Sequence, residues 1–221
     1  RSEVWVYVAL DASVKFTVVK LRNESGRPRR LSATGYVEWV LGDLRPKSTM
    51  HVVTELDPAS GAVFARNSYN TEFGGRVAFF DVDETARSIS GDRTEVIGRN
   101  GTLRNPAAMN RVRLSGKVGA GLDPCTAIQV PFELAGGQER EIIFRLGIGR
   151  TADEAKKSVQ RFRGPAAARA ALDAVQQHWT HTLNAVQVET PDQSLNMLTN
   201  GWLLYQTLAC RLWARSGYYQ S

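Results

Sequence analysis

Three acidic side chains, Asp81, Asp83 and Glu84, fall within four residues and are the first candidates for chemistry in this sequence. A calcium loop of the EF-hand type needs glycine at its sixth position and glutamate at its twelfth, where this sequence has Ala86 and Asp92. Two carboxylates that cleave a glycosidic bond need only be close in space, so no sequence pattern excludes such a pair. We interpret the three residues as the polar end of a strand.

Two histidines, His178 and His181, lie three residues apart in a predicted helix, which can place both imidazoles on one face. The helix of a zinc protease instead has histidines four residues apart and a glutamate directly after the first. Here Trp179 follows His178. We therefore predict exposed histidines and no metal site.

The segment 116–121, Gly-Lys-Val-Gly-Ala-Gly, is rich in glycine, as phosphate-binding loops are. Such loops follow a strand and open a helix, so that the amides of the helix N-terminus face the phosphate. Here Asp123, Pro124 and a predicted strand follow instead. We predict a tight loop that depends on glycine rather than a phosphate site.

The sequence has no catalytic nucleophile that can be recognised from its neighbours. It has no Gly-x-Ser-x-Gly motif, and neither Cys125 nor Cys210 has a histidine nearby. Cys125 begins an apolar strand pattern and Cys210 lies in an amphipathic helix, so we predict two buried free thiols in a reducing compartment. We assign no catalytic residue, no metal and no bound cofactor from these patterns.

The net charge of +6 and the isoelectric point near 9.6 raise the question of a polyanionic partner. Only Arg27, Arg29 and Arg30 form a tight basic cluster, and they lie in a predicted turn. No common nucleic-acid-binding motif is present, so we predict a solvated turn and no nucleic-acid partner. No apolar run approaches the roughly 18 residues of a membrane span, so we expect no membrane insertion by this segment.

The elements that must position these residues are strands in the first 150 residues. Val14, Phe16 and Val18 alternate with polar residues, which buries one face of a strand. The predicted strands cover residues 4–10, 14–18, 36–41, 50–56, 62–65, 77–80, 95–97, 127–134 and 140–146, with another at Ile89 and a long loop over 99–118. Many short strands separated by turns predict a β-sandwich over residues 1–150.

Helical patterns begin at Thr151, where Thr151 and Glu154 have the spacing of a capping box. A helix to about Phe162 is followed by a break at Gly164-Pro165 and a second helix over 166–183. These helices and a short extended link form a helical linker over 151–189. A third helix is predicted to open at Thr190, with a second capping box and a proline in its first turn.

The third helix is apolar around most of its circumference. One stripe and the residues that widen it consist of Leu195, Leu198, Trp202, Tyr205, Leu212, Leu203, Leu204, Leu208, Ala209 and Trp213. Such a helix is normally buried on several sides, yet only eight residues follow Trp213. We expect it to belong to a larger helical domain and, in this chain alone, to pair with a second copy through residues 192–215.

Four segments resemble glycoside hydrolase family 94, the cellobiose and chitobiose phosphorylases, and within it most of all the C-terminal region of the enzymes of cyclic β-1,2-glucan synthesis. The resemblance runs in order from about residue 30 to the end of the chain. The segments are ARNSYNTEFGGRVAFF at 65–80, IGRNGTLRNP at 97–106, GAGLDPCTAIQ at 119–129, and the stretch 190–221 that begins TPD, contains WLLYQT and ends RLWARSGYYQS.

The resemblance implies a mainly β chain. Residues 1–150 would be an N-terminal β-sandwich of the galactose-mutarotase-like super-sandwich type, and 151–189 would be the linker helices. Residues 190–221 would be the first helix of a truncated (α/α)6 catalytic barrel. The family cleaves a β-glucosidic bond with inorganic phosphate as co-substrate and inverts the anomeric centre, while one carboxylic acid protonates the leaving oxygen. In the family that acid lies beyond residue 221.

The resemblance therefore implies a non-catalytic part of a phosphorylase-like glycosyltransferase domain that acts on β-1,2-glucan. Its partners would be β-glucan or an oligosaccharide and the rest of the polypeptide, at the cytoplasmic face of a bacterial inner membrane as the soluble part of a larger membrane protein. The nearest candidates for lining the sugar pocket are Arg215, Tyr218, Tyr219 and Gln220, with packing as their other role. The alternative is a carbohydrate-binding or subunit-contact sandwich without chemistry of its own.

Overall fold

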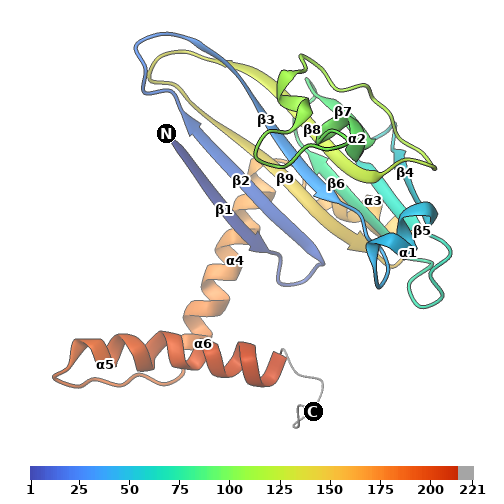
Figure 1. The fold of residues 1–221 in the computed structure, drawn as a ribbon. Helices are drawn as coiled ribbons and strands as arrows, with labels where there is room; N and C mark the ends of the chain where they lie inside the picture. Colours follow the sequence, from blue (N-terminus) through green and yellow to red (C-terminus); the bar gives the residue numbers. More distant parts are fainter. Residues whose placement is uncertain (214–221) are drawn as a thin grey trace. The chain divides into compact units, whose positions relative to one another are not determined.

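The computed structural model describes residues 1–213, and within that range the side chains of residues 1–210. The chain divides into two compact units, Arg1–Ala171 and Leu172–Ser221, and each is described by itself. The first unit contains two antiparallel sheets, the helix α3 (Ala152–Arg161), the start of α4 (Pro165–Leu183) and several short helical turns (Figure 1).

The two sheets of the first unit form a sandwich. The large sheet has the order β1 (Ser2–Val8), β2 (Val14–Arg22), β9 (Glu139–Gly149), β6 (Val77–Val82), β5 (Val63–Asn67) and β4 (Val52–Leu56). The small sheet has the order β3 (Arg29–Glu38), β8 (Pro124–Leu134) and β7 (Ser88–Asp92). All neighbouring strands pair antiparallel. The predicted mainly β fold with an N-terminal sandwich is confirmed.

The core between the sheets depends on one close approach of backbone to aromatic rings. Phe80 of β6 and Phe144 of β9 stack with ring centroids 5.8 Å apart, and both are buried. Gly35 of β3 lies against them from the opposite sheet. A Cβ atom at Gly35 would lie 2.5 Å from Phe144 Cδ1 and 2.7 Å from Phe80 Cζ, so the missing side chain makes room for the two rings.

The other face of the large sheet is covered by α3 and by the start of α4 (Pro165–Leu183). Phe16 of β2 stacks on Tyr7 at 5.0 Å and meets the ring of Phe162 edge-on at 5.5 Å. The Tyr7 hydroxyl donates a hydrogen bond of 2.7 Å to the carbonyl oxygen of Ala168. The predicted alternation of β2 is confirmed, because Val14, Phe16 and Val18 are all buried against this layer.

Two strand predictions were wrong. Residues 95–97 belong to the end of a single helical turn, α2 (Arg93–Val96), because the Asp92 carboxylate accepts a hydrogen bond from Thr94 N at 2.9 Å and caps it. The strand predicted from residue 36 in fact begins at Arg29. The prediction missed its first half because those residues are mostly exposed and show no apolar alternation. Three further short helical turns were not predicted, α1 (Arg45–Ser48), η1 (Thr49–His51) and η2 (Ala107–Asn110).

The second unit contains a rod of consecutive helical segments. They are α5 (Gln193–Met197), the π-helical η3 (Leu198–Trp202), α6 (Leu203–Thr207) and the π-helical η4 (Leu208–Trp213). The predicted cap at Thr190 was wrong, because Asp192 caps the rod by accepting from Ser194 N at 2.8 Å. Thr190 instead bonds to Asn196 of the rod at 2.8 Å. The side-chain amide of Asn200 bonds to both backbone groups of Val188. Val188 N donates to Asn200 Oδ1 at 2.7 Å, and Asn200 Nδ2 donates to Val188 O at 2.8 Å.

The rod leaves large apolar side chains exposed within the described residues. Trp202 is 55% exposed, Leu198 43% and Leu203 47%. No residue of α5, η3 or α6 is buried. This arrangement agrees with the apolar circumference of the sequence and leaves a surface that favours association.

We expect the chain to self-associate through this rod and the substitutions Leu198→Glu and Trp202→Glu together to shift it to monomer. Two new carboxylates on the exposed apolar surface would have to be desolvated at an interface, which is unfavourable. Sedimentation velocity over a range of concentrations measures the outcome.

The matched control carries the same charge on polar exposed positions of the same rod, Ser194→Glu with Thr207→Glu, and should associate like the parent chain. A parent chain that stays monomeric at high concentration, with the rod protected from proteolysis, would contradict the prediction.

Candidate functional site

The residues predicted to line a sugar pocket, Arg215, Tyr218, Tyr219 and Gln220, lie outside the described residues. Within the described part of the chain, no group of three or more histidine, cysteine or acidic side chains could hold a metal ion. His178 and His181 are exposed on α4, as predicted.

The acidic residues that end β6 form a largely buried ion cluster with arginines of the first unit. Asp81 and Arg145 are paired residues of β6 and β9, and both side chains are fully buried. Arg145 Nη2 lies 2.7 Å from Asp81 Oδ2 and also pairs with Asp83. Arg87 Nη1 lies 3.4 Å from Asp81 Oδ1. These four residues together with Arg163 are called the Asp81 cluster.

Two residues at the break between α3 and α4 bind the carboxylates of the cluster. Arg163 Nη2 lies 2.9 Å from Asp81 Oδ2. Gly164 N donates a hydrogen bond of 3.1 Å to Asp83 Oδ2, and its φ of 94° is a conformation that glycine adopts without strain. The break between α3 and α4 is therefore fastened to the large sheet by the carboxylates that end β6.

These contacts assign a structural role to the acidic group. The Asp81 carboxylate is shared by three guanidinium groups, and Glu84 Oε2 lies 2.8 Å from Arg140 Nη2. Oxygen atoms engaged in this way are not free to hold a metal ion or a substrate. The structure agrees with the strand-end interpretation and adds that Asp81 is buried, which makes it important for stability.

Five carboxyl groups of the described residues have a displaced pKa, and in each the pKa is lowered, whereas a general acid needs a raised pKa. Hydrogen bonding to Ser60 lowers the pKa of Asp57. Burial alone would raise the pKa of Glu95, but hydrogen bonds from Ser115 and Ser90 outweigh it and lower the pKa. The pKa is also lowered for Asp11, Glu38 and Glu154. An acid that protonates a glycosidic oxygen requires a raised pKa.

Cys125 is not a nucleophile. Its side chain is fully buried, and burial, with added repulsion from Asp92 and Asp123, raises the pKa of its thiol to about 12. Because the thiolate is the reactive form, this thiol is inert at neutral pH. The prediction of a buried thiol is confirmed for Cys125 but was wrong for Cys210, which is exposed because the apolar helix around it is itself uncovered.

The glycine-rich segment 116–121 is a loop that leads into β8, as predicted, and no helix follows it. Gly116, Gly119 and Gly121 all have positive φ, at 80°, 135° and 72°. Gly119 N donates to Thr54 Oγ1 at 3.0 Å, which attaches the loop to β4. The Gly119 amide is therefore engaged within the protein, and the strand that follows the loop differs from the helix that a phosphate-binding loop opens.

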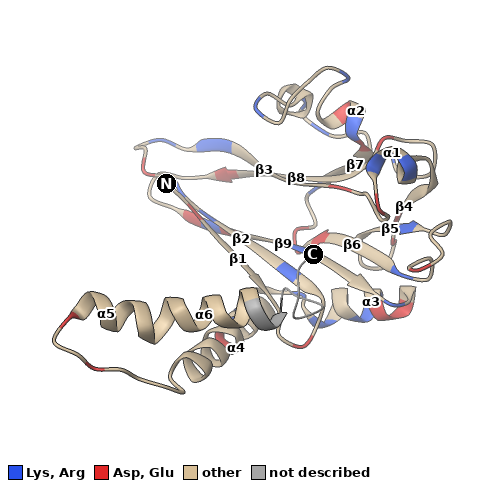
Figure 2. Ribbon diagram, turned by 60° about the horizontal axis from the view of Figure 1, so that its bottom comes forward, with Lys and Arg blue, Asp and Glu red and all other residues tan. Residues whose placement is uncertain are grey.

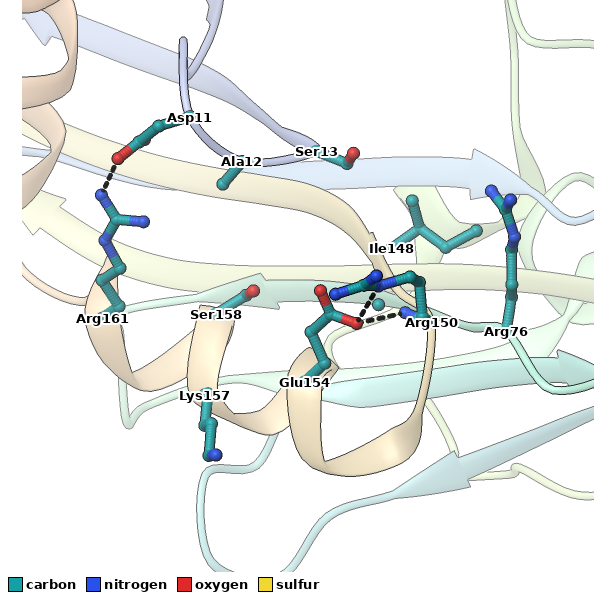
Figure 3. Close-up of a pocket in the computed structure, with 11 residues that line it drawn as sticks. Asp11, Ala12, Ser13, Arg76, Ile148, Arg150, Glu154, Lys157, Ser158 and Arg161 are labelled. Carbon is teal, nitrogen blue, oxygen red and sulfur yellow. Dashed lines mark hydrogen bonds and ion pairs between the residues drawn. The ribbon is translucent and has the colours of Figure 1, made fainter.

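A charged cleft of about 540 Å³ lies between the turn 11–13, the end of β9 and one side of α3 (Figure 3). Arg150, Glu154, Lys157 and Arg161 follow one another at helical spacing along its wall. Arg150 Nε lies 3.2 Å from Glu154 Oε2, and Arg161 pairs with Asp11. We call this the α3 cleft.

A second cleft of about 400 Å³ adjoins the first, because Arg76 and Ile148 line both. It lies between the loop 41–43 and the loop 70–76. Its other lining residues are Leu41, Gly42, Asp43, Asn67, Asn70 and Phe73. We call it the Asp43 cleft. Both clefts fall in the range of about 300–1,000 Å³ that is typical of small-molecule sites.

Sequence reasoning did not find either cleft. Their walls come from segments that are far apart in the chain, and no single segment carries a recognisable motif. The one available signal was the stretch 65–80, which supplies Asn70, Phe73 and Arg76 and was among the segments that carried the family resemblance.

Charges of both signs are interspersed over the sandwich (Figure 2). The Arg27 to Arg30 cluster is divided between a turn and β3, and Arg30 Nε lies 2.7 Å from Glu133 Oε1. Arg30 of this cluster is therefore partly neutralised by an acidic neighbour. Among the described residues, none of the helices combines the length and the apolar character needed to span a membrane.

Two family models match the chain. The model described as the glycosyl hydrolase 94 supersandwich domain matches residues 1–165, and the model of the catalytic domain of the glycosyl hydrolase 94 superfamily matches residues 178–221. The first covers the sandwich, both clefts and α3. The boundaries predicted at residues 150 and 189 remain predictions.

Curated relatives are related glycoside phosphorylases and a glucan synthase. The cyclic beta-(1,2)-glucan synthase NdvB of Rhizobium meliloti is 34% identical over 94% of this chain and 7% of its own length. The N,N'-diacetylchitobiose phosphorylase of Vibrio furnissii is 28% identical over 89% of this chain and 25% of its own length. The cellobionic acid phosphorylase of Neurospora crassa is 28% identical over 90% of this chain and 27% of its own length. The chain thus spans about a quarter or less of these relatives. With three quarters of its residues matched by the supersandwich model, the chain belongs to glycosyl hydrolase family 94.

Proposed function

We propose that this chain is the non-catalytic sandwich, linker and first barrel helix of a phosphorylase-like glycosyltransferase domain that acts on β-1,2-glucan. The observation that carries the proposal is its 34% identity, over 94% of the chain, to a cyclic β-1,2-glucan synthase. The phosphorylases of other disaccharides are less similar, at 28%. We further propose that the segment lies at the cytoplasmic face of a bacterial inner membrane, as part of a larger membrane protein.

The chemistry of the described residues supports a non-catalytic role. Every described carboxyl group with a displaced pKa has a lowered one. The acidic residues that end β6 are paired with arginines. The acid that protonates the leaving oxygen and the site for inorganic phosphate, the co-substrate, are then supplied by the rest of the polypeptide. The part played by this chain is to support that site and to contact β-glucan.

The alternative function is a carbohydrate-binding or subunit-contact module with no tie to a phosphorolytic site. The observation in its favour is the pair of adjoining polar clefts, which are built from the first unit alone. An experiment distinguishes the two functions. The proposed function predicts that this chain, extended by a complete family 94 catalytic domain, carries out phosphorolysis, and the alternative does not.

We expect the purified chain to release no sugar phosphate from sophorose or longer β-1,2-glucan in the presence of inorganic phosphate. The same chain extended through a complete family 94 catalytic domain should release it. Chromatographic detection of glucose 1-phosphate measures both reactions.

Release of sugar phosphate by the chain alone would contradict the proposal, provided that the Glu84→Gln variant, which removes the most accessible acidic residue at the end of β6, abolishes it. An extended protein that cleaves chitobiose or cellobionic acid and leaves β-1,2-glucan intact would overturn the proposed substrate.

A further inference from the structure

We propose that the Asp43 cleft binds a glucosyl unit of a neutral oligosaccharide. This inference rests on the proposed function for the choice of sugar, and on the geometry of the cleft for the binding itself. The residues concerned all belong to the first unit.

The walls of the cleft are held in place before any ligand binds. Asn67, at the end of β5, is 6% exposed. Its Nδ2 donates a hydrogen bond of 2.9 Å to Leu41 O, and its Oδ1 accepts one of 3.1 Å from Tyr69 N. A single buried amide therefore ties both loops of the cleft to the sheet, which lowers the entropic cost of binding.

The backbone of the cleft contains a strained residue. Leu41 has φ 42°, in the left-handed region where residues other than glycine are uncommon. Such strain persists only where the surroundings enforce it, and it concentrates at ligand sites. Here the Asn67 amide holds the Leu41 carbonyl, and the two residues that follow the strained one, Gly42 and Asp43, line the cleft.

The second loop presents donors and an aromatic ring. Asn70 Oδ1 accepts hydrogen bonds from Glu72 N at 3.0 Å and Phe73 N at 2.8 Å, which leaves its Nδ2 to donate into the cleft beside Gly42. The Arg76 guanidinium lies over the Phe73 ring, with Cζ 4.6 Å from the ring centroid. Phe73 is 43% exposed, so ring surface remains for a ligand.

The combination of these groups selects a sugar over other ligands. The Asp43 carboxylate, which has no ion-pair or hydrogen-bond partner among the described residues, accepts bonds from hydroxyl groups and repels a phosphate. Arg76 and Asn70 donate to hydroxyl oxygens, and Arg76 repels a cation. The apolar face of a hexose suits the Phe73 ring. The adjoining α3 cleft, reached past Arg76, gives room for the next sugar of a chain.

The test is titration of the complete chain with β-1,2-linked glucotetraose, followed by amide NMR shifts and calorimetry. We expect saturable binding that perturbs residues 41–43 and 70–76. Asp43→Ala and Phe73→Ala should each weaken it by about 10-fold, since each removes one principal contact. The control is Glu72→Ala, which removes a carboxylate from the same loop outside the lining of the cleft and should bind like the parent.

Thermal unfolding separates lost contacts from lost structure, because Asp43 and Phe73 are exposed and their variants should keep the parent midpoint. Absence of binding, or binding that neither variant weakens, would overturn the cleft assignment. So would inorganic phosphate that perturbs the same amides while the tetrasaccharide does not. None of these outcomes alters the phosphorolysis test of the extended protein, so the two proposals fail separately.

Discussion

Replacing Asp81 by asparagine is expected to lower the free energy of unfolding of the sandwich by about 3–5 kcal/mol, as removal of one partner from a buried ion pair does. The Asp81 carboxylate is fully buried and faces Arg145, Arg87 and Arg163. Without its charge, the fully buried Arg145 would keep only Asp83 as a counter-ion. Burial already lowers the pKa of Arg87, and the attraction of Asp81 opposes that shift.

Such a loss is a large share of the roughly 5–15 kcal/mol that stabilises a typical domain. Urea unfolding followed by tryptophan fluorescence measures it. The matched control is Glu133→Gln, which removes the carboxylate of an exposed pair with Arg30 at 2.7 Å and should cost at most about 1 kcal/mol. Equal effects of the two substitutions would contradict a stabilising role for the Asp81 cluster.

Gly35→Val is expected to destabilise the sandwich by about 1–3 kcal/mol, although valine favours strands over glycine by up to about 1 kcal/mol. The new Cβ would lie 2.5 Å from Phe144 Cδ1 and 2.7 Å from Phe80 Cζ, and these two rings are buried and stacked on each other. Overpacking therefore outweighs strand propensity.

The control for this substitution is Gly26→Val, because a Cβ at Gly26 would meet no atom within 4 Å. Thermal unfolding of both variants should show a lowered midpoint for Gly35→Val alone. An unchanged midpoint for Gly35→Val would mean that the two sheets separate without cost at this point.

The parts of the fold that were predicted correctly are those encoded by neighbouring residues. The alternation at Val14, Phe16 and Val18 indicates one buried face, and Gly164-Pro165 separates two helices because proline is favoured in a first helical turn. The exposed first half of β3 could not be predicted, because pairing with β8 rather than burial makes it a strand. The short helix α2 was also missed, because it depends on one hydrogen bond from Thr94 N to the Asp92 carboxylate that caps it.

The candidate site depended on contacts between distant residues. Asp81 and Arg145 are 64 positions apart, so nothing local distinguishes a buried ion cluster from a solvated strand end. The Asp43 cleft likewise exists only because Asn67 reaches Leu41, 26 positions away. Asn67, Asn70, Phe73 and Arg76 lie in one of the resembling segments, but nothing in that segment indicates that they line a cleft with Leu41, Gly42 and Asp43.

The late position of the consecutive strands β8 and β9 in the chain has a consequence for the order in which the protein can fold. β8 is the middle strand of the small sheet, and β9 separates β2 from β6 in the large one. During synthesis, β1 and β2 leave the ribosome more than 100 residues before the strand that joins them to β6. Long-range pairing of this kind is slow. The nascent chain must therefore keep exposed strand edges from aggregating until residue 149 has emerged, which makes this sandwich a candidate for chaperone dependence.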